Sequence, residues 1–176
     1  MTDTRMNTSF DEQTAATKPL DISIQGRPRV TVAAIIERQG HFLMVEERNA
    51  AGELVINQPA GHVEMDESLV DAAIRETLEE TAWHFTPEFL VGVYLWKQPQ
   101  ARTTFLRVCF AGQVTHHDPA RTLDDGIEQA VWLSHAALLD RSAQLRSPLV
   151  LDTVNDYLSG ERYPLALLKS LVGSTV

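Results

Sequence analysis

The chain has 176 residues, of which 24 are acidic and 15 basic, so its formal net charge is −9 at pH 7. This length predicts one domain with a substantial hydrophobic core, and the 44% hydrophobic content is typical of a globular protein. The negative charge argues against binding to a nucleic acid polymer, and the absence of a long apolar run argues against a membrane span. The single cysteine, Cys109, excludes an internal disulfide and is expected to be a buried, inert thiol. A reducing, cytoplasmic location is therefore expected.

The first part of the chain predicts a tail followed by a hairpin. Residues 1–28 are rich in Thr, Asp, Gln and Ser without a sustained period, and we expect a disordered tail. Two apolar runs, 30–36 and 41–45, flank a turn at 39–40 and predict a β-hairpin. A short strand is expected at 55–56, before a glycine-containing loop.

A helix is predicted after this loop, with Ser68 as its N-cap. At 100° per residue, Glu76, Glu79 and Glu80 lie on one side of it. The residues expected to pack against the protein lie on the opposite side, and they are Val70, Ile74 and Leu78. The helix is thus expected to be packed on one side and to carry carboxylates on the other.

The second part of the chain predicts another hairpin and a final strand. Strand-like runs at 89–96 and 103–114 are joined by a polar connection at 97–102. A polar loop is expected at 116–126, and a short strand at 130–133.

The C-terminal part predicts short helices. Ser134 can cap a helix that runs to 139, Ser147 and Pro148 can start one that ends at Gly160, and 162–171 is expected to form a last helix. The domain is expected to cover residues 29–171, with a tail at 172–176. Strands mixed with helices of this length favour a layered α/β or α+β sandwich.

The three glutamates repel one another, so a compensating charge is expected. Arg75 can pair with Asp71, four residues earlier, or with Glu79, four residues later. A divalent cation is the alternative compensation, because carboxylate oxygens favour Mg²⁺, Mn²⁺ or Ca²⁺. From spacing alone, a metal site and a solvated acidic face are both open.

Gly61, Glu67 and the run Arg75-Glu76-Thr77-Leu78-Glu79-Glu80 have the spacing G-x5-E-x7-R-E-U-x-E-E-x-G-U. This pattern resembles the Nudix box. The resemblance implies a Nudix hydrolase with an α/β Nudix fold, in which a mixed β-sheet lies between helices. Two positions depart from the pattern: Thr77 replaces an aliphatic residue, and Ala82 replaces glycine. Ala82 either adopts a strained left-handed conformation or lets the helix continue toward Trp83.

The resemblance also implies the residues of the site. Glu76, Glu79 and Glu80 would be catalytic residues that bind Mg²⁺, or alternatively Mn²⁺, with the Gly61 carbonyl as a further ligand. Arg75 would be a catalytic-site orienter, and Glu67 a structural residue of the motif.

Further segments, including 30–34, 57–62, 145–150 and 157–165, resemble the NudJ-type phosphatases of this family. This implies hydrolysis of nucleoside tri- and diphosphates, and of hydroxymethylpyrimidine pyrophosphate and thiamine pyrophosphate. The partner would be a small phosphorylated substrate, with neither nucleic acid polymer nor membrane, and the protein a monomer or homodimer. The alternatives are a housecleaning nucleotide or dinucleotide pyrophosphatase and an inert nucleotide-binding domain.

The expected mechanism is metal-assisted hydrolysis, in which glutamate-bound Mg²⁺ neutralises the pyrophosphate and activates a water that attacks phosphorus. Glu79 or Glu80 could be the general base. Asp125 and Glu128, just before the final strand, are the other candidates.

Four residues are candidates for contacts with substrate, each with a structural alternative. Trp96 could stack on a base or pack in the sheet. Arg107 could bind phosphate or form a salt bridge to a glutamate of the box. Gln58 and His62 could contact substrate or stabilise the glycine loop by hydrogen bonds.

Overall fold

A computed structural model describes residues 27–99 and 103–172. Most of the two predicted tails, 1–28 and 172–176, and part of the 97–102 connection lie outside these ranges. The described strands are β1 (Arg29–Arg38), β2 (His41–Arg48), β3 (Leu54–Asn57), β4 (Ala60–His62), β5 (Trp83–Gln98), β6 (Thr103–His117), β7 (Ile127–Ser134) and β8 (Tyr163–Pro164). The helices are α1 (Leu69–Thr81), α2 (His135–Asp140) and α3 (Leu149–Ser159), with 3-10 turns η1 (Ser142–Gln144) and η2 (Leu165–Leu167).

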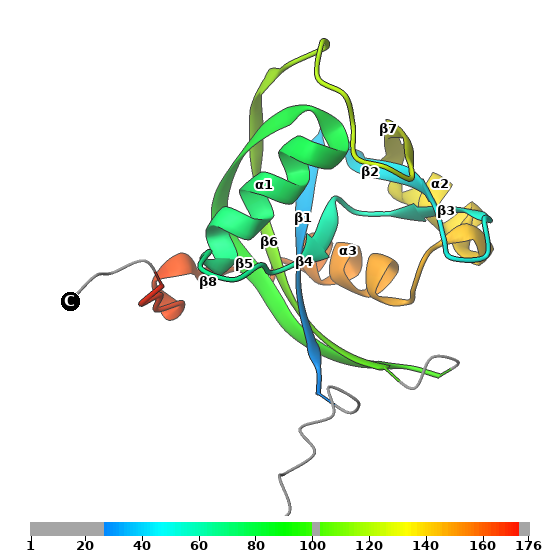
Figure 1. The fold of residues 1–176 in the computed structure, drawn as a ribbon. Helices are drawn as coiled ribbons and strands as arrows, with labels where there is room; N and C mark the ends of the chain where they lie inside the picture. The colour runs from blue at the N-terminus through cyan, green and yellow to red at the C-terminus, as the bar shows by residue number, and fades with distance from the viewer. Residues whose placement is uncertain (1–26, 100–102, 173–176) are drawn as a thin grey trace, which may run out of the picture.

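The strands form one mixed sheet in the order β3-β2-β1-β6-β5-β8, with β4 paired to β1 and β7 paired to β2. The pairing of β1 with β6 is parallel, and the other strand pairings are antiparallel. Helix α1 lies on one face of the sheet and α3 on the other (Figure 1). Six consecutive residues of β1 are buried, because both faces of this central strand are covered. The predicted α/β sandwich and both predicted hairpins are confirmed.

Strand β1 changes its partner along its length. Its end pairs with β2 at Glu37 and Arg38, whereas Thr31, Val32 and Ala33 pair with β4. The short strand β4 contains Gly61 and leads into the segment before α1. Strand β1 therefore exchanges β2 for β4 as its partner beside Gly61, where the predicted box begins.

Helix α1 packs through a wider side than the one predicted. Its buried residues are Ala72, Ala73, Glu76, Thr77, Glu80 and Thr81. Of the residues predicted to pack, Val70, Ile74 and Leu78 are partly buried, and Val70 and Ile74 contact the core. The small side chains let the helix approach the sheet, and the buried Thr77 hydroxyl donates to the Ala73 carbonyl at 2.7 Å. Two of the glutamates are therefore carried into the protein along with the packing surface.

The two ends of α1 are well defined. The Asp71 N–H donates to the Ser68 hydroxyl at 3.1 Å, which confirms Ser68 as the N-cap. Ala82 has φ 58° and its N–H donates to the Leu78 carbonyl at 2.9 Å. Strand β5 begins at Trp83, so of the two open alternatives the left-handed one is correct.

We expect Ala82→Gly to raise the free energy of unfolding by about 1 kcal/mol, because glycine avoids the cost of a Cβ in the left-handed region. Denaturant unfolding of both proteins measures the difference. Ala73→Gly is the matched control, since it removes the same methyl group inside the helix and should lower stability by about 1 kcal/mol. A loss of stability at Ala82 would contradict the interpretation.

Several boundaries differ from the prediction. Strand β5 begins six residues before position 89 and includes Pro87, where the register with β6 shifts. The residue preceding α3 is Pro148 in helical conformation, and the Ser147 hydroxyl does not cap the helix but is buried without a partner among the described residues. The predicted helix at 162–171 is wrong, since β8 and η2 occupy its first part and Tyr163 and Pro164 pair with β5.

Two further expectations concern single features. Cys109 is fully buried as predicted, and burial raises the pKa of its thiol to about 12. Within 27–99 and 103–172, no helix is long and apolar enough to cross a membrane.

Glu46, a buried residue of β2, forms an ion pair with Arg141. Its carboxylate accepts hydrogen bonds from Gln129 at 2.8 Å and Arg141 at 2.7 Å, and these bonds lower its pKa below the ordinary 4.5. Because the folded pKa is depressed, the stabilisation is present above pH 4.5 and is lost as pH falls through the folded value.

We therefore expect Glu46→Gln to cost about 2 kcal/mol of unfolding free energy at pH 7, and progressively less in acid. Urea unfolding of both proteins between pH 7 and pH 3 measures this. The exposed Glu88→Gln is the control. A difference between Glu46→Gln and the natural protein that stays constant with pH would contradict the ion-pair interpretation.

Candidate active site

Arg75 holds together the charged residues of the box. Its Nε and Nη2 donate to the two oxygens of Glu67 at 3.0 and 2.7 Å, and its Nη1 donates to Glu76 and Glu79 at 2.8 and 2.9 Å. Nη2 also donates to the His62 carbonyl at 3.0 Å. These bonds raise the pKa of Arg75. Of the two sequence alternatives, Arg75 pairs with Glu79, while Asp71 bonds the N-cap serine.

Glu80 is the most enclosed of the three helix glutamates. It is 8% exposed, and the Ala60 N–H donates to its Oε2 at 2.8 Å. Burial raises the pKa of Glu80 well above the ordinary value, and the negative charges of Glu47, Glu76 and Asp124 raise it further. A nearby cation would relieve this concentration of negative charge.

Glu76 lies directly against the backbone of Gly61. A Cβ built at Gly61 would overlap the carboxyl group of Glu76, so only glycine leaves this carboxylate its place. Burial raises the pKa of Glu76, and the hydrogen bond from Arg75 opposes the rise.

The residues fit a hard divalent cation by donor type. Glu76, Glu79 and Glu80 each have one oxygen bound to a protein donor, and the other has no hydrogen-bond partner among the described residues. Carboxylate oxygens and a backbone carbonyl are the donors that Mg²⁺ prefers. In the described ranges, no group of three or more Asp, Glu, His or Cys side chains is already arranged to hold a metal ion. Arg75 instead binds one oxygen of Glu76 and one oxygen of Glu79.

The loop before β7 contributes Asp124 more directly than the two residues predicted from sequence. The Asp124 N–H donates to the Glu79 carbonyl at 3.1 Å, and its charge acts on Glu76 and Glu80. Asp125 is exposed on the same loop. Glu128 is paired with Arg48 at 2.6 Å on the surface. Within the described residues, neither Asp125 nor Glu128 forms a hydrogen bond or ion pair with the glutamates of α1.

Trp96 and His62 lie along one row of rings. Trp96 stacks on Phe105 with centroids 5.8 Å apart, and His62 lies 6.4 Å from the same Phe105 ring. The His62 ring is partly covered, and this burial, together with the positive charges of Arg29 and Arg146, lowers its pKa. Sequence reasoning missed Phe105, which resembles an ordinary strand residue.

Gln58 and Arg107 lie together in the interior. Arg107 is 9% exposed and its Nη1 donates to Gln58 Oε1 at 3.4 Å. Among the described residues it forms no salt bridge, so the predicted alternative of an ion pair with a box glutamate is wrong.

Glu47 is a second residue that sequence reasoning missed. Its two oxygens accept from Asn57 and Arg146, both at 3.0 Å, and its charge acts on Glu80. In sequence it is only the end of an alternating strand. Its position follows from the register of β2 with β3, where Glu47 pairs with Val55.

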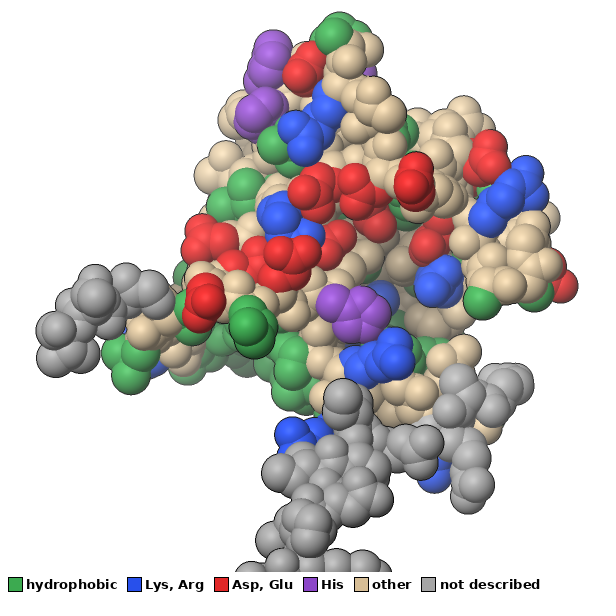
Figure 2. All heavy atoms as spheres, viewed as in Figure 1, with side chains coloured by type: hydrophobic (Ala, Val, Ile, Leu, Met, Phe, Trp, Pro, Cys, Tyr) green, Lys and Arg blue, Asp and Glu red, His purple; other side chains and the backbone are tan. Residues whose placement is uncertain are grey.

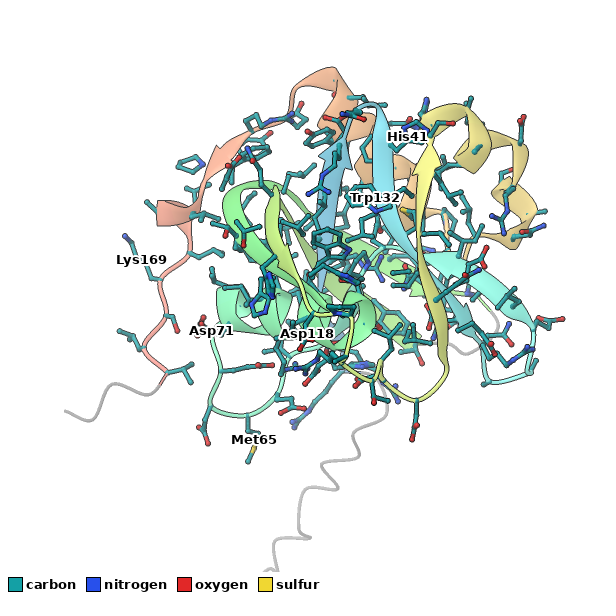
Figure 3. The ribbon with its side chains drawn as sticks, turned by 90° about the horizontal axis from the view of Figure 1, so that it is seen from above. His41, Met65, Asp71, Asp118, Trp132 and Lys169 are labelled. Carbon is teal, nitrogen blue, oxygen red and sulfur yellow. The ribbon has the colours of Figure 1, made fainter. Side chains whose placement is uncertain are left out.

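Acidic side chains gather over α1, and a histidine and basic side chains lie beside them (Figure 2). Figure 3 shows Met65 on the segment that leads into α1 and Asp71 in the first turn of this helix, on the same side of the molecule as Asp118. The acidic set and the basic set therefore meet around β4 and Gly61. Such an arrangement can hold a cation against a phosphate group.

A model of the Nudix domain matches residues 26–153. The chain therefore belongs to the Nudix family and is a hydrolase of phosphoric anhydrides. It is similar to proteins called phosphatase NudJ from Shigella boydii (strain Sb227) and Escherichia coli (strain K12), with 41% and 42% identity over 142 residues. These alignments cover 81% of this chain and 91% of each relative. The structure is also similar to that of a Nudix hydrolase from Nitrosomonas europaea, with a TM-score of 0.83, 46% identity, and coverage of 84% of this chain and 100% of that chain.

Proposed function

We propose that the protein is a Mg²⁺-dependent pyrophosphohydrolase that releases phosphate from nucleoside tri- and diphosphates and from thiamine-type pyrophosphates, namely hydroxymethylpyrimidine pyrophosphate and thiamine pyrophosphate. The observation that carries the proposal is the set of carboxylates around Arg75, placed against the Gly61 backbone. The relatives called phosphatase NudJ support the phosphatase activity.

Glu76, Glu80 and the Gly61 carbonyl would hold the cation, which can also be Mn²⁺, and Glu79 would accept a proton beside them. Bound there, the cation supplies charge neutralisation for the pyrophosphate and lowers the pKa of a water. Arg75 keeps Glu76 and Glu79 oriented, and Glu67 keeps Arg75 oriented through two hydrogen bonds. Preorganised groups of this kind act without a reorganisation cost during the reaction.

Glu79 is the residue we assign to proton acceptance. Its side chain is 26% exposed, whereas that of Glu76 is 11% exposed, and one oxygen is free of protein partners within the described ranges. Arg75 donates to the other oxygen at 2.9 Å and so orients the carboxylate. An accessible, oriented carboxylate can take the proton of the attacking water.

The organic part of the substrate would lie along Trp96, Phe105 and His62. Stacking on aromatic rings depends little on the identity of the base, so one site can accept pyrimidine and purine groups. A cytoplasmic location belongs to the same proposal and is supported by the single buried cysteine. A monomer or homodimer is also part of the proposal.

The test is a Mg²⁺-dependent screen of nucleoside di- and triphosphates, ADP-ribose, dinucleoside polyphosphates and thiamine pyrophosphates, with every product identified. We expect inorganic phosphate from the first and last groups. Release of pyrophosphate or a nucleoside monophosphate would favour a housecleaning pyrophosphatase instead. Absence of turnover with every compound would favour an inert nucleotide-binding domain.

A further inference from the structure

Arg107 is a buried cation without an anionic partner in the described part of the chain. It lies in β6, between Thr31 of β1 and Tyr94 of β5. Its Nε is buried without a hydrogen-bond partner among the described residues, and burial lowers the pKa of its guanidinium. A buried charge is costly unless an anion compensates it. An anion from outside the chain is the natural partner.

Gln58 fixes Arg107 without neutralising it. Gln58 is 1% exposed, and its Nε2 donates to the Val150 carbonyl at 3.2 Å and to the Thr153 hydroxyl at 2.5 Å. Both donors of the amide are thereby directed to α3, and its oxygen faces Arg107 at 3.4 Å. A neutral acceptor forms no ion pair with the guanidinium, so Arg107 keeps its positive charge for a ligand.

Arg107 is placed between the acidic and the basic sides of the site. Its charge interacts with Glu47 and Glu80, and with Arg146. In the β1–β6 pair, Arg29 is opposite Phe105 and Thr31 is opposite Arg107, so the basic and aromatic residues share one face of the sheet. The Thr31 hydroxyl is also buried without a partner among the described residues.

We propose that Arg107, held by Gln58, binds the terminal phosphoryl group of the substrate and selects organic diphosphates whose outer phosphate is free over diesters of pyrophosphate. This rests on the proposed function. A free terminal phosphate carries about −1.5 to −2 at pH 7, whereas an internal diester phosphate carries one charge. It also offers three oxygens to a guanidinium, which binds phosphate through two parallel hydrogen bonds.

The test measures binding by calorimetry, with Mg²⁺, of two analogues that cannot be cleaved. One is ADP with a methylene group in place of the bridging oxygen, and the other is its methyl ester on the outer phosphate. We expect the natural protein to bind the free form more tightly, and Arg107→Gln to weaken that binding about 10- to 100-fold while changing the ester little. Lys169→Gln, on the outlying C-terminal segment, is the control for loss of one charge (Figure 3).

Gln58→Glu is the second variant, and it guards against misfolding of Arg107→Gln. It keeps the Arg107 side chain, and with it any structural role of this residue. The new carboxylate at position 58 neutralises the charge of the guanidinium. We expect it to lose the preference for the free phosphate with the fold retained in the circular dichroism spectrum. Equal affinities for both analogues in the natural protein, or an unchanged preference in the folded variants, would overturn the proposal.

Hydrolysis of ADP by the natural protein separates this inference from the proposed function. If ADP is hydrolysed but analogue binding does not depend on Arg107, the proposed function stands and the inference is rejected. Analogue binding that depends on Arg107, without turnover of any diphosphate, would support the inference and reject the proposed function.

Discussion

Glu80→Gln should raise the Mg²⁺ concentration needed for half-maximal rate, and Glu79→Gln should lower kcat at saturating Mg²⁺ by about 10²–10⁴-fold. The two residues are adjacent in sequence but differ in environment. Glu80 is 8% exposed and bound by the Ala60 N–H, so it is suited to a ligand. Glu79 is more accessible and is oriented by Arg75, so it is suited to proton acceptance.

Steady-state rates measured across a Mg²⁺ titration separate these effects. Circular dichroism and thermal unfolding establish that each variant is folded. Glu64→Gln is the control, because this exposed glutamate lies before the helix and outside the set around Arg75. Near-normal rates in both variants would reject the assignment of the metal site.

Gly61→Ala should lower kcat/KM about 10²-fold with the fold retained, because a displacement of about 1 Å at a catalytic group has effects of this size. The added Cβ would overlap the carboxyl group of Glu76, and that flexible side chain has to move away from the site. The Mg²⁺ requirement should rise at the same time, since Glu76 is one of the proposed ligands.

A double-mutant cycle with Glu76→Ala tests the physical reason. If the only clash is with the Glu76 side chain, then Gly61→Ala should have little further effect once that side chain is removed. The same fold-loss of kcat/KM in both backgrounds would show that Gly61→Ala acts elsewhere. Gly61 was predicted from sequence as a carbonyl ligand, and the cycle asks separately what its missing side chain contributes.

Much of the fold was predictable because its signals are local. The turn at Gln39 and Gly40 and the alternating runs on either side predicted the first hairpin, and Ser68 predicted the start of α1. The 162–171 segment was not predictable in the same way. Its first residues become a strand because Tyr163 and Pro164 pair with Phe89 and Leu90, which are more than 70 residues away along the chain.

The candidate site divides in the same manner. Arg75, Glu76, Glu79 and Glu80 lie within two turns of one helix, so their spacing alone places them together. Glu47 and Asp124 come from other elements, and only the pairing of β2 with β3 and the hydrogen bond from Asp124 to Glu79 bring them near. Reasoning from sequence therefore selected Asp125, in the loop, and Glu128, which lies in β7, and passed over Asp124.

By itself the sequence determined the box: a helix with a capped start, one arginine and three glutamates in a spacing that indicates metal-assisted chemistry. The tertiary structure decided which side of that helix is buried, because small residues let it approach the sheet and carry Glu76 and Glu80 inward. It also decided that Arg107 meets neutral Gln58 and forms no ion pair within the described part of the chain. Helical spacing acts over a few residues, whereas burial and uncompensated charge depend on every element packed around a side chain.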